Sequence, residues 1–449
     1  MKRFLLALLA VAGLATALFA ANGPSKLTLS QCIKIAEEKH PDLAAASAVV
    51  AEAAAQLKIQ HSGFLPHIEA GGSYIRQTYN YTGSGSVAEV PGFAGASGTP
   101  PRLVSLFANG QSFASAPYYY GGLTVSQTIY DAGRTRAEVD RSAAELQAAR
   151  RNYVEVRNTI DLDVREAYYS VLAGEELVQV RTEAVNNQTR HLEQVQAFFE
   201  VGTRPKIDVT RQAVSLANAQ VNLRQAQEDL QVARAALATS MGISIDQAPE
   251  PVNTLYQEQV QETQNQLMAE AESQRPDVQA LEQQVKAAQA DILIARSTLR
   301  PNLGLSTFLD YRNLQFPLIY NWSLGLLAAQ SIFNGGANHA RIIQARAEEQ
   351  AAQANLDSVL QQVAQQVYTA YADLQVAQDK IGLAMKAEAE ARENMELAEG
   401  RYEAGYGNII ELTDAELLLT SSQAQEVTSR YEYQMAAARL DYAVGKRVR

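Results

Sequence analysis

Histidine and cysteine are the side chains most often used for catalysis or metal binding, and their spacing in this sequence supports neither role. Cys32 is the only cysteine, and the sequence has no Gly-x-Ser-x-Gly motif or phosphate-cradling loop. Gly83-Ser84-Gly85 lies in a low-complexity segment and is typical of a flexible linker. The five histidines, none of them at metal-ligand spacing, are His40, His61, His67, His191 and His339. We therefore expect no enzymatic activity, no cofactor and no metal.

The carboxylates with a candidate functional role follow two short turns, each of which contains a glycine. Gly202 and Gly405 each follow a long helical pattern that must end and reverse within a few residues. Glycine suits such a reversal because it adopts left-handed backbone conformations without strain. Asp208 follows the first turn, and Glu411 and Asp414 follow the second. Carboxylates at these positions would be favoured by the dipole of the helix that begins there.

The two turns belong to two copies of one repeat. Residues 129–134 reappear as residues 332–337 at a shift of 203. Upstream the shift is 235, since residues 40–43 match residues 275–278. The difference of 32 residues predicts an insertion in the first copy. A shift that holds at Gly, Pro and Asp positions indicates duplication, because chance similarity of Ala/Gln-rich helices would not align these residue types.

Apolar residues recur every seven positions in the helical stretches, which is the pattern of coiled-coil packing. In the long helix of the first copy these residues are Val164, Val171, Val178, Val185, Leu192 and Phe199. The heptads predict helices over 30–63, 134–200 and 206–241 in the first copy and over 266–299, 337–403 and 409–444 in the second. Each long helix would measure about 100 Å. Ile207, Val214 and Val221 add a second apolar seam, so that a helix could contact neighbours on both sides, as a closed ring of helices requires.

Four short segments have one apolar and one polar face. We expect strands at about 67–79, 118–130, 302–311 and 321–332, with a long external loop at 80–116. Such segments, with aromatic residues near their ends, suit a membrane β-barrel, although two-faced strands also occur in water-soluble sheets. Four strands cannot close a barrel, for which about eight are needed. The chain should therefore oligomerise around a shared barrel.

The N-terminal segment predicts export from the cytoplasm. Lys2 and Arg3 precede an apolar run that ends in small residues, which is the order of a secretory signal. We expect residues 1–21 to be a signal peptide and residues 246–265 to be an equatorial linker between the repeats, which span 22–245 and 266–449. The net charge of −11 and the lack of a basic block argue against binding to nucleic acid.

These features together resemble the TolC-like outer-membrane efflux protein family over essentially the whole mature chain. The resemblance is strongest at Arg401-Tyr402-Glu403-Ala404-Gly405 and at Glu411-Leu412-Thr413-Asp414-Ala415, and it is fainter around Gly202 and Asp208. It implies a mainly α fold with a membrane β-barrel portion, in which a homotrimer pools four strands per chain into a 12-stranded barrel that a 12-column α-helical barrel continues. It also implies an outer-membrane channel, extending into the periplasm, that exports small molecules or proteins from a tripartite efflux or type I secretion complex.

The resemblance further assigns roles to residues near the turns. It implies a gate formed by Tyr402, Glu411, Asp414 and Asp208. The turn residues that would contact a periplasmic adaptor (membrane fusion) protein are Gly202, Thr203, Arg204, Gly405, Tyr406 and Gly407. An inner-membrane transporter and outer-membrane lipid would be the other partners. One position departs from the family, because the basic residue that often follows the second turn glycine by two is Gly407 here, whereas the first copy has Arg204.

Two alternatives stay open from the residues alone. A periplasmic coiled-coil scaffold or adaptor protein would have the same heptads but no lipid-facing strands. A surface adhesin would bind its target through residues 80–116.

Overall fold

The computed structural model describes residues 26–78, 115–253 and 262–446 and divides into two compact units. The first unit contains the described residues of Met1–Ala55, Ala143–Ala287 and Glu348–Arg449, and the second contains those of Gln56–Ser142 and Ala288–Ala347. The expected signal peptide, most of the loop 80–116 and part of the linker 246–265 lie outside the described residues. In the described ranges, no helix combines the length and the apolar character needed to cross a membrane.

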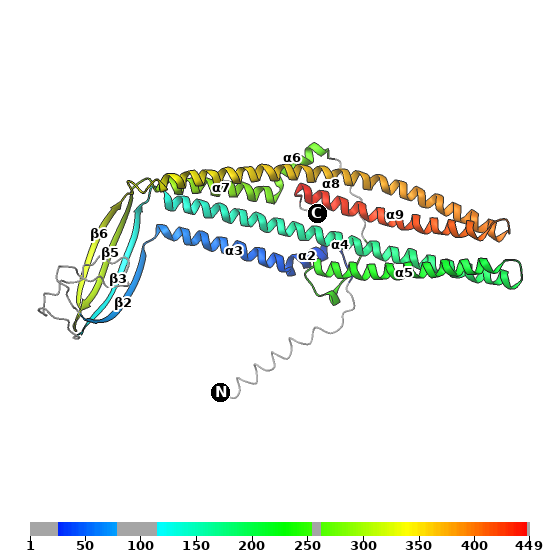
Figure 1. Ribbon diagram of the computed structural model, residues 1–449, viewed down its shortest axis with the longest axis horizontal. Helices are drawn as coiled ribbons and strands as arrows, with labels where there is room; N and C mark the ends of the chain where they lie inside the picture. The colour runs from blue at the N-terminus through cyan, green and yellow to red at the C-terminus, as the bar shows by residue number, and fades with distance from the viewer. Residues whose placement is uncertain (1–25, 79–114, 254–261, 447–449) are drawn as a thin grey trace, which may run out of the picture. The chain divides into compact units, whose positions relative to one another are not determined.

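Two helical hairpins dominate the chain (Figure 1). In the first repeat, α4 spans Arg134–Glu200 and α5 spans Lys206–Ser240. In the second, α8 spans Ala337–Glu403 and α9 spans Ile409–Val444. These are the ranges that the heptads predict, except that α5 ends one residue earlier. Alanine, glutamine and glutamate favour helix throughout, and heptad residues such as Val164, Val171 and Val367 are fully buried.

The leading helix of each repeat is broken, and the prediction of one helix over 30–63 and one over 266–299 was wrong. The first consists of α2 (Leu29–Lys39), α3 (Pro41–His61) and the short 3-10 helix η1 (Ser62–Phe64). The second consists of α6 (Gln264–Gln274) and α7 (Pro276–Ser297). Each break falls on the residue before a proline, because the proline ring disfavours the helical conformation there. His40 and Arg275 accordingly have extended ψ angles of 127°.

At each break, the C-terminal end of the last helix of the same repeat packs against the leading helix. Gly242 lies just past α5 and has φ +67°; a Cβ atom there would lie 2.7 Å from the Cα of His40. Gly445 caps α9 with φ +77°, and a Cβ atom there would lie 3.0 Å from the Cα of Arg275. Both positions therefore need glycine for the backbone angle and for the close approach.

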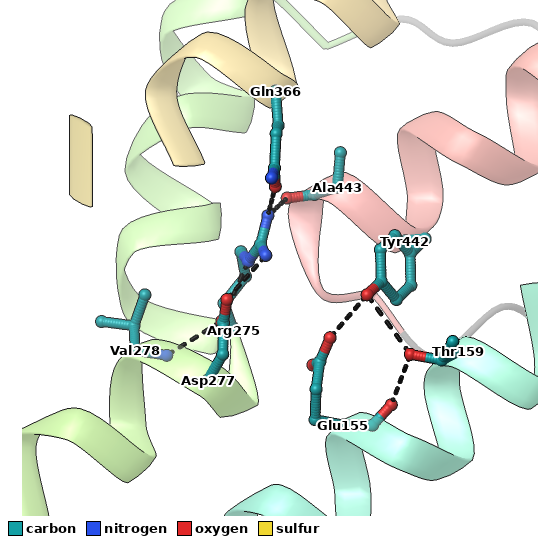
Figure 2. A network of polar contacts seen from close by, with 8 residues as sticks. All are labelled: Glu155, Thr159, Arg275, Asp277, Val278, Gln366, Tyr442 and Ala443. Atoms are coloured by element: carbon teal, nitrogen blue, oxygen red, sulfur yellow. Dashed lines mark hydrogen bonds and ion pairs between the residues drawn. The ribbon is translucent and has the colours of Figure 1, made fainter. Parts of the chain in front are cut away.

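Arg275 ties this junction together in the second repeat, as Figure 2 shows. Its guanidinium group donates to both carboxylate oxygens of Asp277, at 3.0 and 2.7 Å. It also donates to Oε1 of Gln366 on α8 at 2.5 Å and to the carbonyl oxygen of Ala443 on α9 at 3.3 Å. Beside it, the hydroxyl of Tyr442 donates to Glu155 at 2.6 Å, which joins α9 to α4 (Figure 2). Arg275 thus links the break between α6 and α7 to the end of α9 by hydrogen bonds.

The expected linker 246–265 is partly regular in its described residues. The 3-10 helix η2 (Ile245–Gln247) is followed by β4 (Glu250–Pro251), which pairs in parallel with β1 (Lys26–Leu27). The hydroxyl of Tyr168 donates to the carbonyl oxygens of Leu27 and Val252 at 3.2 and 2.6 Å, so this small sheet is fixed to the middle of α4.

The second unit contains one antiparallel sheet of four strands in the order β2-β3-β5-β6 (Figure 1). Its strands are β2 (His67–Thr78), β3 (Ser115–Tyr130), β5 (Asn302–Asn313) and β6 (Ile319–Ala329). The expected strand 321–332 was therefore placed too late, since β6 ends opposite Asn302, the first residue of its partner, and Ile332 has no strand to pair with. The expected loop 80–116 is also too long at its end, because β3 begins at Ser115.

The register places the two faces of the sheet as the alternation predicts. Leu123, Leu309 and Trp322 lie opposite one another across β3, β5 and β6 and so share one face. The rows on the other face are mostly polar, as in Ser126 opposite Ser306, although Phe308 also lies on this face. Trp322, Leu324 and Leu326 are largely exposed in the single chain. The sheet therefore presents an apolar face that no described part of its own chain covers.

Candidate gate at the helix turns

The first turn is closed by main-chain hydrogen bonds to the end of α4. Gly202 has φ +75°, and its N–H donates to the carbonyl oxygen of Phe199 at 3.0 Å. The N–H of Thr203 donates to the carbonyl oxygen of Phe198 at 2.9 Å. Pro205 is the residue just before α5; it has an extended backbone and its side chain makes no capping hydrogen bond. The chain reverses between Glu200 and Lys206 while the carbonyl oxygens of Ala197, Phe198 and Phe199 at the end of α4 accept hydrogen bonds from the turn.

The second turn repeats this arrangement at the end of α8. Gly405 has φ +78°, and the N–H groups of Tyr406 and Gly407 both donate to the carbonyl oxygen of Arg401, at 2.9 and 2.8 Å. Asn408 caps α9 with its side chain, which accepts from the N–H of Glu411 at 2.9 Å. The asparagine cap satisfies one of the free N–H groups at the start of α9.

Arg204 connects the two turns. Its guanidinium carbon lies 4.7 Å from the centre of the Tyr402 ring, which is cation–π geometry. The same group donates to the carbonyl oxygens of Tyr402 and Gly407 at 3.5 and 3.4 Å. The ring of Phe198 contacts Tyr402 from α4, with 6.3 Å between ring centres. The first repeat therefore holds the second repeat through Arg204 at the turns.

The ring of Tyr402 is at the centre of this contact, and its hydroxyl group takes no part in it. The side chain is 1% exposed, and its hydroxyl has no hydrogen-bond partner among the described residues. Burial raises the pKa of Tyr402, with Arg204 acting against the rise and Asp208 adding to it. Asp208 is itself buried near the start of α5. Tyr402, Arg204 and Asp208 thus lie together, and the ring of Tyr402 rather than its hydroxyl carries the link.

The other two predicted gate residues lie apart from this contact. Glu411 is partly exposed and pairs with Arg401, with 3.2 Å between Nε and Oε1. Asp414 is exposed one turn further along α9. Tyr406 at the turn is 85% exposed, so the second turn presents an apolar ring to its surroundings.

A buried polar cluster, which the sequence interpretation did not include, lies further from the turns. Glu416 on α9 is 2% exposed and accepts from Nε2 of Gln188 on α4 at 2.8 Å. Nε2 of His191 lies 3.7 Å from the same carboxylate oxygen. Gln212 on α5 donates to Oε1 of Gln188. A signal exists in the sequence, since Gln188 and Gln212 each follow a heptad valine (Val185 and Val209) by three and so occupy core positions of the seam.

Ionisation of these buried groups is disfavoured. Burial raises the pKa of Glu416 to about 7, and the negative charge of Glu399 adds to the rise while Arg190 opposes it. Burial lowers the pKa of His191, while Glu399 acts in the opposite direction. No group of three or more metal-ligating side chains that could hold an ion occurs in the described ranges.

The doubled helical hairpins, the two glycine turns and the four-stranded sheet coincide with a known pattern. The outer membrane efflux protein family matches residues 32–243 and 267–446. The chain belongs to this family. The prediction of family is therefore confirmed, and with it the prediction of an outer-membrane export channel.

Individual members of the family align over nearly the whole chain. The pyoverdine export outer membrane protein OpmQ of Pseudomonas putida is 26% identical over 437 residues, which cover 93% of this chain and 85% of that protein. OpmQ of Pseudomonas aeruginosa is 27% identical over 424 residues, covering 90% and 81%. The crystal structure of the outer membrane protein VceC of Vibrio cholerae superposes with a TM-score of 0.79 at 21% identity, covering 93% of this chain and 96% of that one. The predicted fold class, mainly helical with a strand portion, is confirmed.

Proposed function

We propose that three copies of this chain form one outer-membrane duct, with a 12-stranded β-barrel made of three four-stranded sheets and a barrel of 12 helical columns. The observation that carries this proposal is the sheet itself. It has an uncovered apolar face, and among the described strands β2 and β6 each pair on one side only. Open edges do not occur in lipid, because every backbone polar group there must be paired. Pairing β6 with β2 of a neighbour removes both edges.

The exposed seams of the helices support the same assembly. Ile207, Val214 and Val221 recur every seven residues along α5 and are more than half exposed in the single chain. Ile410 and Leu417 are the equivalent exposed residues on α9. Heptads that are exposed in one protomer are the surface that a neighbouring helix of a coiled coil would cover.

In this assembly the duct passes cargo without chemistry of its own, and the turns form its periplasmic end. Tyr402 and Asp208, with Arg204, hold the two repeats together there, while Glu411 and Asp414 supply carboxylates that a threefold axis would gather into a ring. Exposed turn residues, including Tyr406, would contact a periplasmic adaptor protein that links the duct to an inner-membrane transporter. Outer-membrane lipid would surround the sheet, and the acidic chain would not bind nucleic acid.

The mass of the purified protein in detergent tests the assembly. We expect a stable complex of three chains, measured by native mass spectrometry or by light scattering with the detergent subtracted. Substituting Leu324 and Leu326 in the middle of β6 by proline should abolish the trimer, because proline is not tolerated in a strand that is paired on both sides. Proline at Ala329, the last residue of β6, is the control. A wild-type protein that stays monomeric under all conditions would exclude the shared barrel.

A further inference from the structure

Glu416 is buried where helices of both repeats meet. Its Oε2 atom accepts from Gln188, and Gln188 accepts in turn from Gln212, so that a chain of hydrogen bonds joins α9 to α4 and α5. All three side chains are almost completely buried. The Oε1 atom of Glu416 has no hydrogen-bond partner among the described residues.

The groups that face Glu416 leave its charge poorly compensated. On α4 these are His191, with Nε2 at 3.7 Å, and Arg190, which acts through space. On α8 the nearest charge is the carboxylate of Glu399, which repels it, and Glu403 also faces His191. On α5 the neutral Gln212 is linked to Glu416 only through Gln188. A buried carboxylate with one unpaired oxygen and a like charge nearby is more stable with a bound proton.

We propose that Glu416 and His191 form a proton-binding site that holds α9 against the α4–α5 hairpin, and that loss of the proton releases α9 beside the turns. The ligand of the site is a proton, carried on the unpaired carboxylate oxygen, Oε1, while the imidazole of His191 lies beside the other oxygen, Oε2. The inference rests on the proposed function in one respect only, namely that release of α9 widens the channel.

The direction of the pH effect follows from the two pKa changes. When α9 is released into solvent, Glu416 returns to its ordinary pKa of 4.5, whereas in the packed state it is about 7. Its stabilisation of the packed state is therefore complete below pH 4.5 and is lost as the pH rises through about 7. His191 acts in the opposite direction, since burial lowers its pKa and packing weakens as the pH falls below 6.5. The change at Glu416 is the larger, so the packed state should loosen as the pH rises.

Hydrogen–deuterium exchange of the full chain in detergent tests the site directly. With exchange corrected for its intrinsic pH dependence, protection of residues 409–420 should fall up to about 100-fold between about pH 5 and about pH 8. Glu416→Gln mimics the protonated carboxyl and should keep the protection high at every pH. Glu432→Gln removes a partly exposed carboxylate from the same helix, one that pairs with Lys380 and lies away from the turns, and should leave the pH dependence of the wild type. A Glu416→Gln protein with wild-type pH dependence would overturn the proposal.

A second variant covers the case in which Glu416→Gln does not assemble. Gln188→Met removes the hydrogen-bond donor to the carboxylate, so the midpoint of the pH dependence should move upward; an unchanged midpoint contradicts the site. Conductance in planar bilayers over the same pH range separates this inference from the proposed function. Loss of protection without any rise in conductance would leave the proton site standing and remove its link to the channel, whereas constant protection would remove the site itself.

Discussion

Arg204 supplies from the first repeat the positive charge that the second repeat lacks at position 407. A side chain at Gly407 would place its Cβ atom 3.0 Å from the backbone nitrogen of Tyr402, so the packed turn has no room for one. The guanidinium group of Arg204 instead comes from the other repeat and donates to the carbonyl oxygens of Tyr402 and Gly407. Arg204 therefore supplies the polar part of the contact between repeats at the turns, beside the ring contact of Phe198 with Tyr402.

We expect Arg204→Gln to weaken this contact. Loss of a cation–π interaction of about 0.5–1 kcal/mol would raise the open fraction of the channel about two- to fivefold. Single-channel recording in planar bilayers measures this fraction. Tyr402→Phe is a matched control, because it keeps the ring under the guanidinium group and removes a hydroxyl without a described partner. A larger effect from Tyr402→Phe than from Arg204→Gln would show that the hydroxyl carries the contact after all.

The carboxylates of Glu411 and Asp414 call for a different measurement. If a threefold axis gathers three copies of each, the combined negative charge should favour cations in the pore. The double variant Glu411→Gln with Asp414→Asn preserves the shapes of the side chains and should move the ratio of cation to anion permeability toward unity. Reversal potentials in a salt gradient give this ratio. Unchanged selectivity would mean that these carboxylates serve only the start of α9.

At the scale of elements, the turn glycines differ from the glycines inside helices. Gly405 has φ +78°, whereas Gly400 lies within α8. At both positions a Cβ atom would meet nothing within 4 Å, so the two differ in backbone angle and not in space. Gly405→Ala should therefore lower the free energy of unfolding by about 1 kcal/mol through backbone strain alone. Gly400→Ala should raise it by about 0.5–1 kcal/mol, because alanine favours helix. Chemical unfolding in detergent, followed by circular dichroism, compares them. Equal effects would contradict the assignment of strain to the turn.

Heptads predicted the long helices well and the leading helices badly, for one physical reason. Leu43 and Val50 continue an apolar spacing that shows no sign of a break, and only Pro41 marks it. A single proline is weaker than a long period but decides the backbone of the residue before it. The turns were predictable because glycine is required there. The Glu416 cluster was not, since contacts between α4, α5 and α9 depend on how the helices are aligned with one another.

At the scale of the whole molecule, the repeats are joined in two different ways. In the helical unit they meet through side chains, as in the hydrogen bonds from Tyr431 and Tyr442 on α9 to Glu176 and Glu155 on α4, both at 2.6 Å. In the sheet they are joined through the backbone, since β3 of the first repeat pairs with β5 of the second. Side-chain contacts can separate when a channel opens, whereas a paired backbone in lipid cannot.

The pairing of β3 with β5 also governs how the chain can fold. Thr124 lies opposite Phe308, so the partners are roughly 180 residues apart in sequence, and contacts so distant form slowly. At synthesis rates of about 5–20 residues per second, β2 and β3 would wait roughly 10–40 s for their partner. An apolar hairpin with an open edge aggregates easily during such a delay. Residues 22–245 produced alone should therefore aggregate, and adding residues 246–449 as a separate chain should reduce aggregation, as sedimentation would measure. A first repeat that stays soluble and monomeric would show that its hairpin needs no partner. If it aggregates, the exported chain depends on a holding chaperone until its second half has been made.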